Sequence, residues 1–141
     1  LGKPFNPHSI FHETGQTIFG GFGSTAQHSY FQLLHQGTSQ CSADIIYSPS
    51  DQTSLSNAQA RGQSNLLSSE QNQSANSLER TNGNVPVNLF TLPKLSLKEL
   101  GFLLATWEHR VYVTASLLQI NPFDQFGVAA GKKAAQKFHK K

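Results

Sequence analysis

The sequence is poor in cysteine and charge and has no long hydrophobic run. Cys41 is the single cysteine of 141 residues, which excludes an internal disulfide framework and fits a reducing compartment. The opening residues Leu1-Gly2-Lys3-Pro4 lack the apolar core of a signal peptide. The most apolar stretch is interrupted by the charged segment 108–110, so no uncharged run reaches the roughly 18 residues of a membrane span. We therefore expect a cytoplasmic chain without a membrane partner.

Several motifs of cofactor and metal chemistry are also absent. No Walker loop, zinc pattern or nucleophile elbow occurs in the sequence. His8, His12 and Glu13 have a spacing that could hold a metal on a helix, but Pro7 and the polar context argue against a helix there. We expect neither a metal nor a cofactor. The chain also has no methionine, even at its first position, and we expect such a chain to be a fragment, a processed product or a partial sequence.

Apolar residues are unevenly distributed. They make up 37% of the chain, and its length suits one domain, taken as residues 1–141. Residues 95–120 are rich in leucine, valine and aromatic side chains, whereas 11 of the 17 residues 62–78 are Ser, Gln or Asn. Such composition is typical of a loop or a partly disordered segment, so a polar loop or insertion is predicted over about 48–84. The alternative is one amphipathic helix held by the leucines of this region, Leu66, Leu67 and Leu78.

The first third of the chain predicts a strand, a helix and a second strand. Residues 17–19 form a short apolar run before a pair of glycines, and residues 43–47 form another apolar run. Between them, Ser24 or Thr25 can cap a helix that ends near Gln36. Strand, helix and strand at this spacing predict a parallel sheet covered by helices.

The last third predicts a strand and a long apolar helix. Residues 88–92 form the strand, and Ser96 with Glu99 forms a capping box that opens a helix to about Gln119. This helix is apolar on most sides, so we expect it to be buried between layers. Within it, Glu108-His109 is interpreted as a buried, hydrogen-bonded pair.

His28 is the first candidate for chemistry. It follows a glycine-rich turn in the first turn of the predicted helix, where backbone amides favour an anion or substrate. An imidazole there can exchange protons near pH 7. The alternative is a histidine that packs against the next strand, and composition alone favours that alternative.

The segment 123–132 supplies two further candidates. Asp124 can cap a C-terminal helix over about 124–139. Lys132 lies inside this helix beside the small residues Ala130 and Gly131, so a ligand could approach its ammonium, which can pair with a developing oxyanion. Gln125 can donate to and accept from a sugar hydroxyl. The alternatives are a surface lysine and a capping or structural amide.

Positive charge gathers at the C-terminus. The net charge is +3, and the last ten residues hold five lysines and no acid: Lys132, Lys133, Lys137, Lys140 and Lys141. This end could bind an anion or nucleic acid. A solvated helix end, whose lysines suit the helix dipole, is the simpler interpretation.

Four blocks of the sequence together resemble the motifs of one known enzyme family. Residues 20–38 read Gly-Gly-Phe-Gly-Ser-Thr-Ala-Gln-His-Ser-Tyr-Phe-Gln-Leu-Leu-His-Gln-Gly-Thr, similar to the family block G-x-x-G-T-N-x-Q-H-x-F-x-Q-L-x-H-Q-G-T. Residues 83–86 resemble its G-N-R-P block, and residues 107–110 resemble Y-E-H-K. Residues 115–132 resemble its C-terminal signature. The blocks occur in the family's order and span almost the whole chain, and the family that they resemble is the glucose-6-phosphate isomerases.

The resemblance implies a fold, a reaction and a set of roles. The fold would be α/β, a three-layer sandwich with a parallel sheet of the sugar-isomerase type, here its C-terminal part. The family interconverts glucose 6-phosphate and fructose 6-phosphate through a cis-enediol, in glycolysis and gluconeogenesis, without a cofactor. His28 and Lys132 would assist opening of the sugar ring, and Gln125 would line the substrate pocket. The family's histidine enters the neighbouring subunit's site, so a homodimer is expected.

The family's catalytic base has no counterpart among these residues. Its proton-shuttling glutamate lies in an E-S-x-G-K motif, and Leu1-Gly2-Lys3 resembles the last three positions. The glutamate would fall two positions before Leu1, and the family's phosphate-binding Ser/Thr loop is missing too. We therefore expect the chain to be inactive alone.

Three residues also depart from the family pattern. Val85 replaces an arginine, Ala115 a glycine, and Ala129 a usually polar residue. These departures leave open an alternative, a non-catalytic, degenerate copy that binds an anion or nucleic acid through its basic C-terminal helix.

Overall fold

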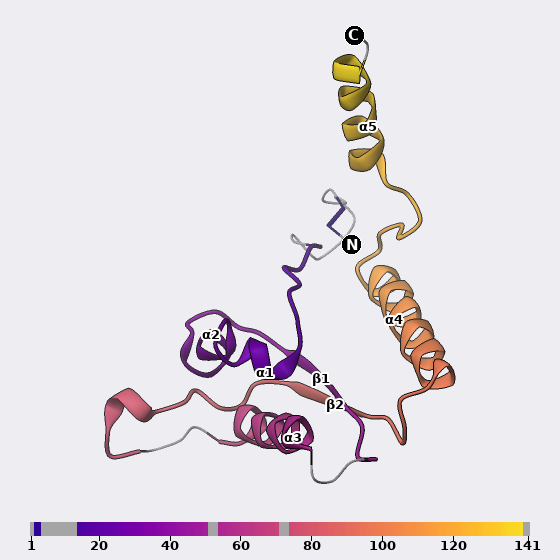
Figure 1. Cartoon of the computed structure of the whole chain (residues 1–141). Coiled ribbons are helices and arrows are strands. Elements are labelled where there is room, and N and C mark those ends of the chain that lie inside the picture. Colours follow the sequence, from indigo (N-terminus) through magenta and orange to yellow (C-terminus); the bar gives the residue numbers. More distant parts are fainter. Residues whose placement is uncertain (1, 4–13, 51–53, 71–73, 140–141) are drawn as a thin grey trace. The chain divides into compact units, whose positions relative to one another are not determined.

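The computed structural model describes residues 2–3, 14–50, 54–70 and 74–139 (Figure 1). They fall into two units, one of residues 18–101 and one that combines residues up to 17 with those from 102 onward. We call these the sheet unit and the terminal unit. Their elements are, in chain order, α1 (Gly23–Ala26), α2 (Phe31–Gln36), β1 (Ala43–Tyr47), α3 (Leu55–Ser68), the 3-10 turn η1 (Ser77–Glu79), β2 (Val87–Thr91), α4 (Leu97–Leu117) and α5 (Phe126–His139).

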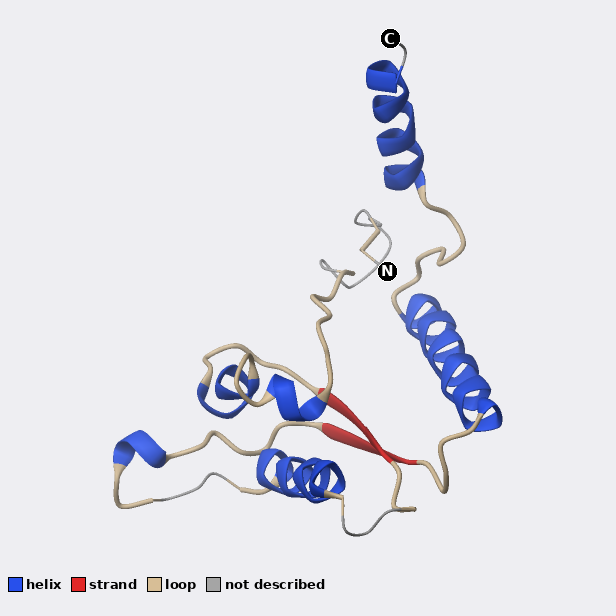
Figure 2. Ribbon diagram, viewed as in Figure 1, coloured by secondary structure: helices blue, strands red, loops and turns tan. Residues whose placement is uncertain are grey.

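The sheet unit is built on one parallel strand pair (Figure 2). β1 runs beside β2, in a register that pairs Ala43 with Val87 and Tyr47 with Thr91. Parallel strands need a long crossover, and the residues between these two strands include α3. The predicted α/β class with a parallel sheet is confirmed, and so are the strands expected near 43–47 and 88–92.

The strand predicted over residues 17–19 is wrong. This segment has no regular structure, and its apolar side chains are not buried in a sheet: Ile18 is 82% exposed and Phe19 is 51% exposed. The rings of Phe19 and Tyr30 instead meet in a T-shaped contact, with centroids 5.1 Å apart. The strand–helix–strand unit therefore uses β2 as its second strand, and the apolar run at 17–19 packs locally.

A helix occupies much of the polar segment 48–84. α3 lies across β1 and β2, and Leu67 on it is the largest fully buried side chain described. The helix alternative is thus the one that forms, held by Leu67. Leu66 is 38% exposed and Leu78, in η1, is 82% exposed, so these two leucines do not pin the segment as the alternative supposed.

A small core joins α2, α3 and the sheet. Leu34, Leu67 and Val85 form it, and a ring of half-buried side chains packs around them: Tyr30, Phe31, Cys41, Ala43, Ile45 and Val87. Val85, one of the three departures from the pattern that the sequence resembles, is 9% exposed, and its burial suits an apolar residue. Cys41 is a free thiol at the edge of this core, so packing accounts for it.

The long helix α4 forms as predicted but is not buried in this chain. Ala115 is fully buried, whereas Leu97, Phe102 and Leu117 are 87%, 63% and 70% exposed. An apolar pattern shows which faces a helix can bury, but burial itself needs a facing layer. Among the described residues, no helix is long and apolar enough to cross a membrane.

Candidate active site

His28 lies in the turn that links α1 to α2, not in the first turn of a helix as predicted. The expected single helix from Ser24 to Gln36 is broken here. Ser24 does not cap it, because its hydroxyl donates to Oε1 of Gln59 on α3 at 2.9 Å. The backbone amide of His28 donates to the carbonyl of Thr25 at 3.3 Å. The argument from a helix N-terminus therefore does not apply to this histidine.

Backbone hydrogen bonds and a ring contact hold the turn that carries His28. Ala26 is 2% exposed, and its carbonyl accepts from the amides of Ser29 and Tyr30 at 3.0 and 3.1 Å. The Tyr30 ring stacks on Phe31, with centroids 5.7 Å apart. These contacts fix the backbone and leave the His28 side chain exposed, which excludes a histidine packed against the next strand.

A second histidine of the same block serves as a contrast. His35 donates from Nε2 to Oε1 of Gln63 on α3 at 2.7 Å, and the neighbouring Gln36 donates to the carbonyls of Leu78 and Arg80 at 3.0 and 2.6 Å. His35 therefore joins α2 to α3, and Gln36 joins α2 to the segment that precedes β2. Structural contacts explain both residues. Within the described part of the chain, the imidazole of His28 makes no such hydrogen bond, and structure alone does not account for it.

Gln125 occupies the N-terminal boundary of α5. Its carbonyl accepts the amide of Ala129 at 3.0 Å, and the helix begins at Phe126. Asp124, the predicted cap, does not serve that role. Both its carboxylate and its backbone carbonyl accept from the ammonium of Lys3.

Gln125 and Lys132 share one face at the start of α5. Seven residues make almost two helical turns, so the two positions lie within about 20° around the axis and about 10 Å apart along it. Both side chains are exposed. A Cβ added at Gly127 or Gly131 would meet nothing within 4 Å. The arrangement places an amide and an ammonium on the same exposed face of the helix.

Sequence reasoning missed Lys3 as a residue of this region. Lys3 ends the segment Leu1-Gly2-Lys3 and Asp124 belongs to the segment 123–132, both singled out in the sequence, but no local pattern joins residues 121 positions apart. The structure brings the two segments into contact within the terminal unit. His28 belongs to the sheet unit, whereas Gln125 and Lys132 belong to the terminal unit.

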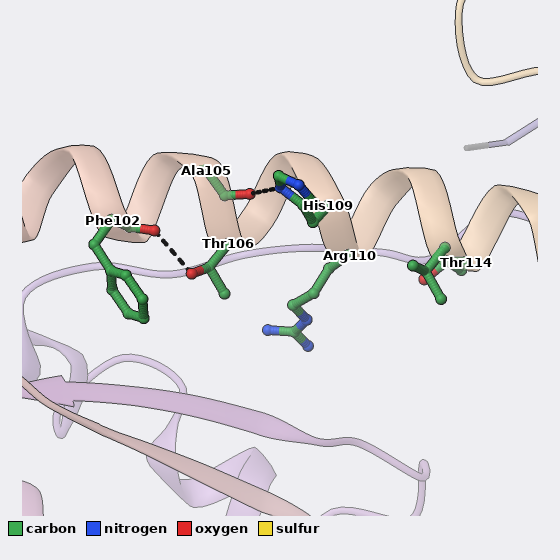
Figure 3. Close-up of a pocket in the computed structure, with 7 residues that line it drawn as sticks. Phe102, Ala105, Thr106, His109, Arg110 and Thr114 are labelled. Carbon is green, nitrogen blue, oxygen red and sulfur yellow. Dashed lines mark hydrogen bonds between the residues drawn. The ribbon is translucent and has the colours of Figure 1, made fainter.

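The buried pair predicted at Glu108-His109 is wrong. Both residues are exposed on α4, and Nδ1 of His109 lies 2.7 Å from the carbonyl of Ala105 on its own helix (Figure 3). The groove beside them is one face of α4 and not an enclosed pocket, since a single helix supplies all of its lining residues: Phe102, Ala105, Thr106, His109, Arg110, Val113 and Thr114.

The described residues hold no cluster of three metal-ligating side chains. His8, His12 and Glu13 lie outside the described residues, as do Lys140 and Lys141 of the basic end. Lys132, Lys133 and Lys137 are exposed along α5.

Comparison with known proteins gives a consistent result. A family model described as phosphoglucose isomerase matches residues 5–141. Glucose-6-phosphate isomerase from Psychrobacter cryohalolentis is 37% identical over 162 aligned positions, which cover 98% of this chain and 29% of that protein. The enzyme of that name from Legionella pneumophila is 36% identical over 129 positions, which cover 92% of this chain and 26% of that protein.

A solved structure agrees. The crystal structure of a glucose-6-phosphate isomerase from Chlamydia trachomatis superposes with a TM-score of 0.72 at 31% identity, over 82% of this chain and 25% of that one. The chain thus spans between a quarter and a third of the length of these relatives. It belongs to the phosphoglucose isomerase family.

Proposed function

We propose that these residues form the C-terminal portion of a glucose-6-phosphate isomerase, which interconverts glucose 6-phosphate and fructose 6-phosphate. The observation that carries the proposal is the family match, which covers residues 5–141 and therefore includes His28, Gln125 and Lys132. The relatives named for this activity match 98% and 92% of the chain. The comparisons give no support to the alternative of a nucleic-acid-binding module.

The exposed side chains suit the first step of this reaction. Ring opening moves a proton from the anomeric hydroxyl to the ring oxygen. An imidazole can take and return that proton near pH 7, and an ammonium can offset negative charge that develops on oxygen. We assign these roles to His28 and Lys132. Gln125, on the face of α5 that carries Lys132, would bind a sugar hydroxyl.

The later step requires residues beyond these. Passage through the cis-enediol moves a proton between two adjacent carbons, and the family's glutamate performs this transfer. No residue of this chain matches that glutamate, so these 141 residues alone should not turn over fructose 6-phosphate. The proposal also includes a homodimer in which His28 enters the neighbouring subunit's site, and a cytoplasmic location.

The roles can be tested in an isomerase chimera, in which these 141 residues replace the matching part of the Psychrobacter cryohalolentis enzyme. His28→Ala and Lys132→Ala should each lower kcat by roughly 10²-fold or more, the usual scale for acid–base groups. Lys133→Ala, beside Lys132 on the same helix, is the matched control and should leave kcat near the parent value. Near-parent turnover in either of the first two variants removes that residue from the mechanism.

The isolated chain provides a separate check. It should be assayed with fructose 6-phosphate at the same molar concentration as the chimera. No turnover above buffer is expected. Turnover comparable with that of the chimera would show that the chain supplies its own base and would contradict the assignment.

A further inference from the structure

The terminal unit contains a long-range ion pair between Lys3 and Asp124, which lie 121 positions apart in the chain. The Lys3 ammonium donates to both the carboxylate and the backbone carbonyl of Asp124. The two side chains are 17% and 29% exposed. A partly shielded, doubly hydrogen-bonded ammonium holds its partner more firmly than an exposed surface pair does.

The Lys3 end of this pair is held in place by its own neighbours. The Gly2 amide donates to the Thr14 carbonyl at 3.0 Å, and the Thr14 hydroxyl donates to the Lys3 carbonyl at 2.6 Å. Thr14 is 6% exposed. Gly2 has φ +76°, a conformation that favours glycine. Lys3 therefore extends from a fixed backbone.

The Asp124 end of the pair lies just before the start of α5. Asp124 directly precedes Gln125, whose carbonyl receives the first helical hydrogen bond from Ala129. The preceding residue, Phe123, donates its amide to Oδ1 of Asn121 at 2.9 Å. No described residue of α5 is buried, so packing along the helix does little to fix it. The position of its first turns depends on this junction.

We propose that the Lys3–Asp124 pair is a positioning contact that fixes the first turns of α5, and with them Gln125 and Lys132, for a phosphorylated sugar. The helix is rigid over the two turns that separate these residues, so a displacement at Asp124 moves both groups together. This assignment rests on the proposed function for the identity of the ligand, but the contact itself can be tested without it. Lys3 is a positioning residue and does not contact the reacting atoms.

The first arm of the test uses the 141-residue chain and hydrogen exchange by NMR. Lys3→Gln keeps most of the side-chain length and removes the charge, and it should speed exchange of the Ala129 amide about fivefold or more, because a charge-assisted hydrogen bond is lost. Lys3→Arg restores a cation and should keep the parent rate. Lys133→Gln removes a charge from α5 without touching the pair and should also keep it. An unchanged Ala129 rate in Lys3→Gln overturns the proposal.

The second arm uses the isomerase chimera. Lys3→Gln should lower kcat/KM for fructose 6-phosphate about tenfold or more, the scale expected when catalytic groups are displaced, and Lys3→Arg should recover most of it. If exchange of the Ala129 amide becomes faster but kcat/KM does not change, the contact does not position the site and the proposal fails. If the folded chimera is inactive while Lys3→Gln still speeds exchange of the Ala129 amide, the contact stands and the proposed function is the part that fails.

Discussion

At the scale of single residues, contacts between segments far apart in the chain hold the backbone beside the candidate side chains. His28, Gln125 and Lys132 are all exposed, and their roles in the reaction stay predictions. Their supports were missed, because Asp124 binds Lys3 and Ser24 binds Gln59 in place of the predicted caps. A local pattern can show that a side chain suits a cap, but it cannot show a competing partner far along the chain.

Replacing two glycines by alanine should change the free energy of unfolding in opposite directions. A Cβ at Gly37, where α2 ends, would lie 2.3 Å from the Leu33 carbonyl oxygen, whereas one at Gly62, inside α3, meets nothing within 4 Å. Gly37→Ala should therefore lower the free energy of unfolding of the sheet unit by roughly 1–3 kcal/mol, the usual cost of overpacking. Gly62→Ala should raise it by about 1 kcal/mol, because alanine favours a helix interior.

Urea unfolding followed by circular dichroism measures both changes on the same chain. Equal effects of the same sign would contradict the geometry at the end of α2.

At the scale of elements, strands and helices with a strong pattern were predictable and their environment was not. β1, β2 and α4 lie where the apolar runs place them. The segment 17–19 has the composition of a strand but no partner strand, and α3 is rich in polar residues yet carries the most buried leucine. Both features depend on contacts between distant segments, which periodicity alone does not contain.

Adjacent leucines on α3 test whether this helix is part of the fold or a polar insertion. Leu67 is 1% exposed in the core and Leu66 is 38% exposed. Leu67→Ala should lower the free energy of unfolding by about 2–4 kcal/mol, since it opens a cavity. Leu66→Ala makes the same chemical change on the same helix and should cost well under half as much. Similar urea midpoints for the two variants would mean that α3 does not pack as described.

The first turn of α4 should respond to acid. The Ser96 hydroxyl donates to the Glu99 carboxylate, and this hydrogen bond, with Lys94 and Lys98 nearby, holds the pKa of Glu99 below its ordinary value of 4.5. A carboxylate whose pKa is lowered by folding contributes stability above the unfolded pKa and loses it as the pH falls through the folded one. The contribution of the Glu99 carboxylate to the stability of this turn should therefore be constant above about pH 4.5 and decrease at lower pH.

An NMR titration of the Glu99 carboxyl group measures this pKa. Its midpoint should lie below 4.5 and should rise toward 4.5 in Ser96→Ala. A midpoint that is the same in both proteins would show that the serine hydroxyl is not the cause.

At the scale of the whole molecule, the family and the α/β class were accessible from sequence blocks, while burial was not. Apolar side chains along α4 stay exposed in this chain, and the chain matches 29% and 26% of its two relatives' lengths. A helix is buried only when the neighbouring layers of the fold cover it. The apolar pattern of α4 therefore predicts a burial that these residues alone do not provide.

The most direct test of the account concerns the proposal that His28 and Lys132 act in one site shared between two subunits. The His28→Ala and Lys132→Ala chimeras should each be nearly inactive. When they are mixed and allowed to exchange subunits, half of the dimers should be mixed, each with one intact site, and activity should return to about a quarter of the parent value. Subunit exchange without any recovery of turnover would contradict the shared site.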